Sequence, residues 1–283
     1  MQFDLRVDQN LCSLMNVSIG GKMATKSPYR IPVPTINTAS ICAEACWYGI
    51  NYKNLKATVP DEELLQYFAE PMYRHGRNKA NFNPDIFRSQ VKTLISVCGL
   101  NALNLGASRM DLLKGIATIK GKIFKHFDAV QMNRPVMPAV NLSMTAIKDL
   151  SSGLVTHTQY HQIILASRIL FFNTPNIEIF NISSGISRNL GFSGRPYKYL
   201  TALNLKMHQI HLANRTQLSR CRKPKVLLLT GVLANSFAST TWWERRVLDL
   251  ALLLHFNEIS FDANLRQRVL ASRNHRNRLL ATP

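Results

Sequence analysis

The distribution of acidic residues constrains this chain more than any other feature of its sequence. Between Asp149 and Glu244 the only acid is Glu178, whereas the same interval holds ten lysines and arginines. The first hundred residues contain 11 bases and 8 acids, but residues 101–283 contain 24 bases and 8 acids. Because acids are so few in the second part, its bases cannot all be neutralised locally, and the fold must carry positive charge at its surface.

The chain as a whole has 35 lysines and arginines against 16 acids, a formal net charge of +19. Self-repulsion at this level destabilises a compact state, so a partner of opposite charge is expected. A field made by omitting carboxylates is what binding to a phosphate chain requires. Hydrophobic residues make up 46% of the chain, enough to form a core, so disorder is a poor interpretation. We therefore expect a folded protein that binds RNA, most readily single-stranded RNA.

Cysteine usage and hydropathy limit the compartment in which this protein works. The five cysteines are odd in number and irregular in spacing, which disfavours a disulfide framework and favours reduced thiols. The first residues lack the apolar run of a secretory signal, and no apolar run reaches the ~20 residues that a membrane helix needs. The sequence thus predicts an intracellular, cytoplasmic protein without membrane insertion.

Apolar residues recur mainly with a helical period, which predicts a mainly α fold with few short strands. Prolines and glycines near the start indicate an extended N-terminal arm over residues 1–36. We expect an N-terminal helical lobe over residues 37–132, a C-terminal helical lobe over residues 133–260, and a basic C-terminal helix over residues 261–283. The two lobes would enclose a basic groove.

Several elements are predicted in the part of the chain that carries the charge bias. Residues 183–196 are rich in glycine and serine and indicate a loop, and residues 215–225 indicate a basic connector. A short strand is expected over Ile177–Ile182. The predicted helices are Thr38–Tyr48, Leu142–Leu150, Thr158–Phe172, Tyr197–Leu212 and Thr241–His255.

Catalytic and metal-binding patterns are largely missing. His157 and His161 are four residues apart but lack the glutamate of a zinc protease, and Cys42 and Cys46 lack a second ligand pair at zinc-site spacing. A metal-dependent nuclease or polymerase needs clustered carboxylates, which the basic half cannot supply locally. We therefore expect no catalytic residues, no metal and no cofactor.

The expected loop over residues 183–195 is the first candidate RNA-binding segment. Its glycines allow close backbone approach to a phosphate, and Arg188 and Arg195 offer guanidinium forks for phosphate oxygens. The next three residues would place aromatic rings for base stacking beside a charge: Tyr197, Lys198 and Tyr199.

The basic connector and the C-terminal helix are the second and third candidates. No acid lies in the connector, and none follows Asp262 in the C-terminal helix, so both can lie along a phosphate backbone. A solvated face is the alternative interpretation of such runs. The further residues expected to contact RNA are Lys206, Arg215, Arg220, Arg222, Lys223, Lys225, Arg266, Arg268, Arg273 and Arg276.

In this layout the chain resembles the nucleoproteins of segmented negative-strand RNA viruses. The segment Ala139–Ala146, which reads AVNLSMTA, is similar to the Val/Asn/Ser/Ala-rich motif of plant emaravirus nucleoproteins. The resemblance implies a protein that coats and packages RNA without sequence preference, that is found in the virion, and that forms homo-oligomers through its terminal arm. It assigns no role to individual residues.

Three other functions fit the same charge pattern. A structural ribonucleoprotein subunit, such as an organellar ribosomal protein, would share the basic tails but stay monomeric on one folded RNA site. A nucleic-acid-processing enzyme would require a carboxylate cluster near Arg188 and Arg195 in the folded protein. A movement-type protein at a membrane surface would bind anionic vesicles at least as well as RNA.

Overall fold

The computed structural model confirms a mainly α structure for the part of the chain that it describes. The one sheet in the described part of the chain is an antiparallel ladder between β1 (Ile50–Asn51) and β2 (Lys56–Ala57). The structure describes residues 31–47, 50–51, 56–57, 136–154, 158–174, 177–192, 196–221 and 241–258, and the single positions 110, 122, 126 and 267.

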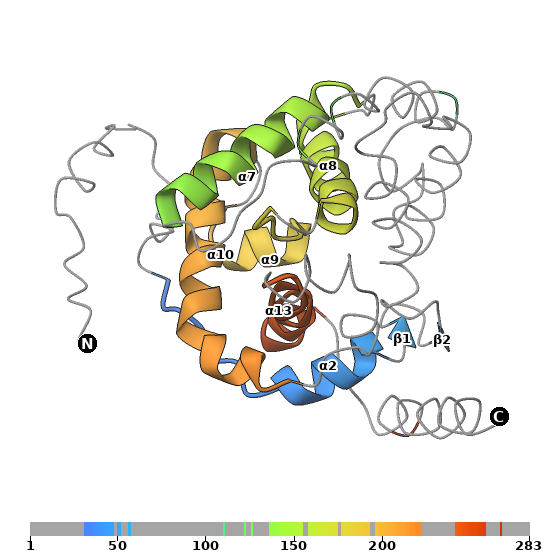
Figure 1. The fold of residues 1–283 in the computed structure, drawn as a ribbon, viewed down its shortest axis with the longest axis vertical. Coiled ribbons are helices and arrows are strands. Elements are labelled where there is room, and N and C mark those ends of the chain that lie inside the picture. Colours follow the sequence, from blue (N-terminus) through green and yellow to red (C-terminus); the bar gives the residue numbers. More distant parts are fainter. Residues whose placement is uncertain are drawn as a thin grey trace, which may run out of the picture.

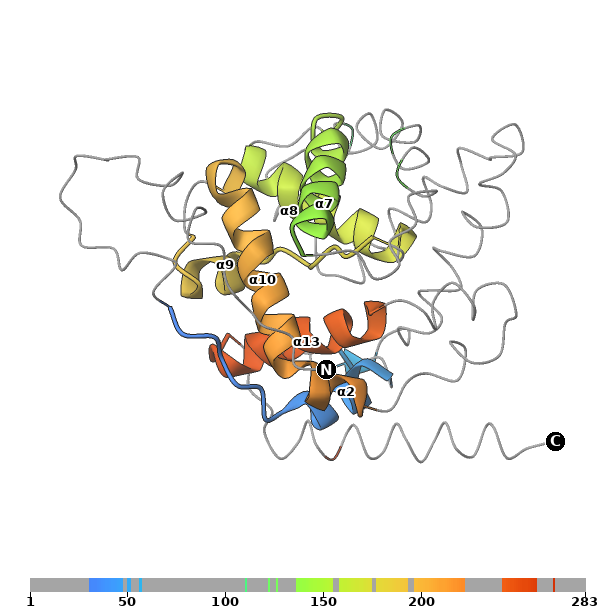
Figure 2. The ribbon, with the colours of Figure 1, turned by 60° about the vertical axis from the view of Figure 1, so that its left-hand side comes forward.

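The helices surround one central helix, α13, which Figure 1 shows nearly end-on in dark orange. The long helix α10 runs along one side, α7 and α8 lie at one end of the molecule, and α2 lies at the other end in both views (Figures 1 and 2). The described helices are α2 (Ala39–Trp47), α7 (Val136–Ser151), α8 (Gln159–Asn173), α9 (Ser184–Asn189), α10 (Pro196–Ser219) and α13 (Trp242–His255).

The central position of α13 follows from its side chains. The helix packs against α2, α9 and α10, and buried residues lie on nearly all of its faces. A helix that is buried all round belongs to the interior of a domain. Trp242 is 1% exposed, and its indole donates a hydrogen bond of 2.8 Å to the carbonyl of Phe171 in α8. A buried tryptophan N–H needs such a partner, so this bond also fixes α8 against α13.

Hydroxyl caps explain where two of the helices begin. The Thr158 hydroxyl accepts a hydrogen bond from the backbone N–H of His161, which starts α8 one residue after the predicted boundary. Ser183 caps α9 in the same way through the N–H of Ile186. Each cap satisfies a backbone donor that the first helical turn would otherwise leave unpaired.

The predicted loop over residues 183–196 is wrong for residues 184–189, which form α9. Two side chains of this segment, Ile186 and Leu190, are buried, so the short helix is held by packing. Gly191 then ends it with a φ of 82°, a left-handed conformation that suits glycine. The glycine that indicated a loop is therefore a helix C-terminal residue.

Two other predicted boundaries are also wrong. Helix α10 continues to Ser219, beyond the predicted end at Leu212, so the first part of the expected basic connector is helical. Helix α7 begins at Val136, six residues before the predicted start at Leu142, and it includes Pro138 in its first turn. Proline in a first helical turn costs little, since its missing N–H would have no acceptor there. The predicted strand over Ile177–Ile182 has no strand assignment in the structure.

Other expectations concern parts of the chain outside the described residues. They include most of the N-terminal arm, the helices expected between residues 58 and 135, and the basic C-terminal helix over residues 261–283. The expected lobe boundary near residue 133 also stays a prediction. Of the arm, only the last residues, from Ile31 on, are described.

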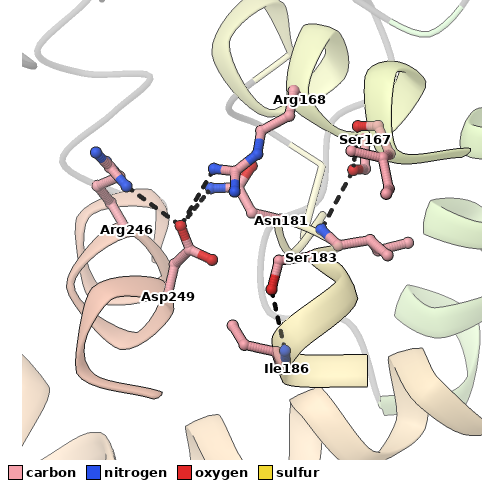
Figure 3. Close-up of polar contacts among 9 residues, drawn as sticks. Ser167, Arg168, Asn181, Ser183, Ile186, Arg246 and Asp249 are labelled. Atoms are coloured by element: carbon pink, nitrogen blue, oxygen red, sulfur yellow. Dashed lines mark hydrogen bonds and ion pairs between the residues drawn. The ribbon is translucent and has the colours of Figure 1, made fainter. Parts of the chain in front are cut away.

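A charged cluster centred on Asp249 lies inside the helical core (Figure 3). The Asp249 carboxylate is 1% exposed, and its Oδ2 lies 3.2 Å from Arg168 of α8, from Asn181 and from Arg246 of its own helix. A buried carboxylate is tolerated only when cationic and hydrogen-bonding partners offset its loss of hydration. Asp249 therefore joins α8, the extended segment before α9, and α13.

We predict that Asp249→Asn strongly destabilises the fold. The substitution leaves Arg168 buried without its anion, and breaking a buried pair in this way costs roughly 3–5 kcal/mol. Chemical denaturation followed by circular dichroism measures the free energy of unfolding. Asp149→Asn is the matched control, because Asp149 is 25% exposed and its pairing with Lys122 and His126 contributes only about 1 kcal/mol or less. Equal losses in the two variants would contradict the assignment.

Candidate nucleic-acid interface

Every carboxylate whose side chain the structure describes contacts a basic or histidine side chain of the same chain. These contacts hold the acids of the charge-biased region within the fold, where they join helices to one another. The pairs are Asp149 with Lys122 and His126, Glu178 with His208, Glu244 with His211 and Arg215, Asp249 with Arg168 and Arg246, and Glu258 with Arg188.

These pairings determine where the positive surplus lies. A carboxylate paired with a lysine or arginine is close to neutral from outside, so such a pair adds little to the external field. Glu178 keeps its negative charge, because its partner His208 is neutral. The formal net charge of +19 must then be carried by other cations. Two of the described carboxylates lie against exposed bases, Glu258 at 2.8 Å from Arg188 and Glu244 at 4.0 Å from Arg215, and the other three contact less exposed partners.

The C-terminal half of α10 carries exposed cations. Arg215 has a side chain that is 58% exposed, with its Nε 4.0 Å from a Glu244 oxygen, and Arg220 is exposed just after the helix ends. Leu212, 49% exposed, lies on the same stretch of helix. The chain continues from this end of α10 into the basic residues 222–225, which lie outside the described part.

Arg188 lies on α9 and is held by a carboxylate. Its guanidinium donates to Glu258, just beyond α13, at 2.8 Å, and the amide of Asn189 donates to the same carboxylate oxygen at 2.8 Å. The Arg188 side chain is nevertheless 65% exposed. The sequence predicted that Arg188 binds phosphate, whereas in the structure Arg188 is paired with the Glu258 carboxylate of the same chain.

Lys206 does not lie on the exposed surface. It is 7% exposed, and its ammonium donates to the carbonyl of Ile31. Desolvation lowers the pKa of the Lys206 ammonium below its usual value. Lys206 therefore binds the segment before α2, and we no longer assign it to RNA binding.

The segment over residues 31–36 docks along α10 through a second anchor, Asn214. The Asn214 side-chain oxygen accepts from the N–H of Ile36 at 2.8 Å, and its amide donates to the carbonyl of Pro34 at 2.9 Å. One side chain thus satisfies a donor and an acceptor of an extended backbone, as a neighbouring strand would. The end of the expected arm is therefore bound to a helix surface.

The remaining predicted contacts divide into two groups. Tyr199, in α10, is half-buried with its ring 6.2 Å from that of Phe192, so part of its surface is already used in packing. Tyr197 and Lys198 lie in the first turn of the same helix. Outside the described residues are Arg195, Arg222, Lys223, Lys225, Arg266, Arg268, Arg273 and Arg276.

The described candidates are spread out. Helix α10 has 24 residues and therefore spans about 36 Å, with Tyr197 near its start and Arg220 just beyond its end. Groups separated by this distance cannot hold one small anion together. They can contact successive groups of an extended polyanion.

Helix α10 carries a buried histidine pair, which the sequence indicated only as ordinary helix residues, with pH-sensitive charge at a phosphate site as the less favoured interpretation. His208 is 2% exposed and His211 is 4% exposed, and both rings lie against the edge or face of Phe180. His208 Nδ1 lies 3.3 Å from Glu178, and His211 Nε2 lies 2.8 Å from Glu244. Their spacing of three residues places them on one helix face.

The environment keeps His208 neutral. Burial lowers the pKa of His208 to about 3, and the neighbouring Arg245 and His211 act in the same direction. These effects outweigh the attraction of Glu178, which is itself partly exposed. His208 is then a neutral ring whose Nδ1 lies 3.3 Å from the carboxylate of Glu178.

The described residues form no group of three or more histidine, cysteine or acidic side chains that could hold a metal ion. Cys42 lies in α2, which packs against α13, and its side chain is buried. Burial raises the pKa of the Cys42 thiol to about 12, so this thiol is a poor nucleophile. A cavity of about 370 Å³ lies between residues 35–41 and the end of α13, and the one ionisable side chain among its lining residues is His255. None of the helices that the structure describes combines the length and hydrophobicity needed to cross a bilayer.

We predict that acid destabilises the protein through His208. The pKa of His208 is lowered from 6.5 to about 3 on folding, so between these values the unfolded chain binds a proton that the folded chain does not. The free energy of unfolding therefore falls as the pH is lowered through this window, by up to about tenfold in the unfolding constant per pH unit.

The variant His208→Gln isolates this effect, because glutamine can still donate to Glu178 but does not titrate. Urea unfolding at several pH values between 7.5 and 4 should give a weaker pH dependence for the variant than for the wild type. The same slope in both proteins would show that His208 titrates normally in the folded state.

Comparison with protein-family models gives no match, and neither the curated proteins nor the solved structures contain a significant match to this chain.

Proposed function

We propose that this protein binds single-stranded RNA through its surface cations, without sequence preference, and packages it as a nucleoprotein. The observation that carries the proposal is the engagement of every described carboxylate within the fold, while Arg215 and Arg220 stay exposed. These two arginines also lead into a basic stretch with no acid between Glu178 and Glu244.

Phosphate chemistry explains why this arrangement suits RNA. Guanidinium groups bind phosphate oxygens in a forked geometry, and each phosphate neutralised releases a condensed counterion. Arg215 and Arg220, followed in the sequence by the bases of residues 222–225, fit a chain of phosphates better than a single compact ligand. Contacts of this kind position a backbone and carry no sequence information, which supports coating of RNA rather than recognition of one site.

The docking of residues 31–36 on α10 supports the proposal of a homo-oligomer. Asn214 and Lys206 bind backbone atoms of this segment, not its side chains. Backbone contacts of this kind would also accept the equivalent segment of a neighbouring protomer. We propose that the arm links protomers on the RNA, as the resemblance to viral nucleoproteins implies.

The proposed activity is binding and needs no catalytic group, metal or cofactor. We place it in the cytoplasm, with the virion as its second location if the protein is viral. Proteins that coat RNA act by charge and shape along the whole strand. The proposal therefore rests on the distribution of cations over the surface.

We predict that Arg215→Gln, Arg220→Gln and Arg222→Gln together weaken RNA binding uniformly across sequences. Fluorescence anisotropy with labelled oligoribonucleotides of different sequence measures the affinity at several salt concentrations. If the three arginines each neutralise one phosphate, the slope of log affinity against log salt should flatten by about 2.

Lys148→Gln is the control for this experiment. Lys148 is exposed on α7, which lies at the opposite end of the molecule from the end of α10 near α2 in both views (Figures 1 and 2). The Lys148→Gln substitution removes one positive charge outside the proposed surface, so the slope of log affinity against log salt should change by less than 1. An unchanged affinity and slope in the triple variant would exclude this surface.

A further inference from the structure

Glu258 is fixed in place by the turn that ends α13. Its backbone N–H donates to the carbonyl of Leu253 at 2.9 Å, and the N–H of Asn257 donates to the carbonyl of Leu254. Asn257 has a φ of 56°, the left-handed conformation that completes this helix-ending motif. The main chain at Glu258 is therefore held to the end of α13, from which its side chain extends to α9.

The site that receives this carboxylate is built from three residues of α9. Arg188 and Asn189 both donate to the same oxygen of Glu258, each at 2.8 Å. A Cβ at Gly185 would lie 2.5 Å from the carboxyl carbon of Glu258, so the absence of a side chain at Gly185 allows the anion its present close approach. We name Gly185, Arg188 and Asn189 the α9 cradle.

We propose that the α9 cradle is a binding site for a phosphate group, and that Glu258 occupies it in the absence of nucleic acid. This inference rests on the proposed function, because it names one phosphate site within the RNA-binding surface and the group that controls access to it. The carboxylate stands in for the phosphate oxygens. The two anions are alternatives, because the cradle has room for one of them.

The chemistry of the cradle favours this exchange. A guanidinium and an amide N–H converging on one oxygen, beside a glycine that allows close approach, bind phosphate as they bind carboxylate. The Arg188 side chain is 65% exposed, so an incoming phosphate can reach it from solvent. An ion pair that is this exposed is weak, so a phosphate chain held at other cations can displace Glu258.

The test is a mutant cycle in the full-length protein. Glu258→Ala empties the cradle and should raise the affinity for a labelled twelve-nucleotide oligouridine by about two- to fivefold, as expected for release of an exposed ion pair. Glu258→Ala in an Arg188→Ala background should gain much less, because the cradle has lost its main donor. Circular dichroism and thermal unfolding confirm that the variants fold.

Asp149→Ala is the matched control, since its carboxylate is exposed to the same 25% and is also paired, but it lies at α7 away from the cradle. It corrects for the general gain in affinity on removing one negative charge. If Glu258→Ala gains no more than Asp149→Ala, or gains equally with and without Arg188, the cradle is not a phosphate site and Glu258 serves stability alone.

A second readout separates this inference from the proposed function. Inorganic tripolyphosphate should raise the melting temperature of Glu258→Ala more than that of the wild type, and Arg188→Ala should abolish the difference. If that holds but no variant binds oligouridine, the cradle stands and the RNA-binding function fails. If oligouridine binds but Glu258→Ala behaves as the control in both assays, the cradle alone is wrong.

Discussion

The fold depends on the charges buried around α13. This helix lies at the centre of the described structure, yet it carries Glu244, Arg245 and Asp249 in its buried faces. Arg245 donates to the carbonyl of Ile179 and lies over the ring of Phe171, 5.7 Å from its centroid. Burial lowers its pKa to about 10, so it remains a cation near neutral pH. Each of these charges must meet partners on other elements, and this requirement fixes how those elements pack.

The surface properties follow from the same constraint. Asp249 contacts the buried Arg168, and Glu178 and Glu244 contact buried histidines, so at most about a quarter of each of these acidic side chains is exposed. Glu258 pairs with the well-exposed Arg188, and Glu244 also lies 4.0 Å from the exposed Arg215. The proposed role of the surface thus follows from where the few acids are placed. The positive surface depends less on the number of cations than on which carboxylates are already paired within the fold.

Local patterns in the sequence predicted α2, α8 and α13 well, because apolar residues recur in them with a helical period, and in α8 the Thr158 hydroxyl also caps the first turn. They failed at α9, where tertiary packing of Ile186 outweighs the glycines. They also missed the partners of Asp249, since Arg168 and Asn181 are 81 and 68 residues away along the chain. Pairings over such separations have no local signature. For the same reason the sequence could not separate a buried cation such as Lys206 from an exposed one.

The central claim is that the positive surplus of this protein binds RNA. The most direct measurement is size-exclusion chromatography of the protein purified from cells, with the ratio of absorbance at two ultraviolet wavelengths recorded before and after nuclease and high salt. The account predicts a large, RNA-containing species that becomes smaller and free of nucleic acid on treatment, and that re-forms when unrelated RNA is added at low salt. A protein that elutes free of nucleic acid at low salt and stays unchanged on adding RNA would contradict it.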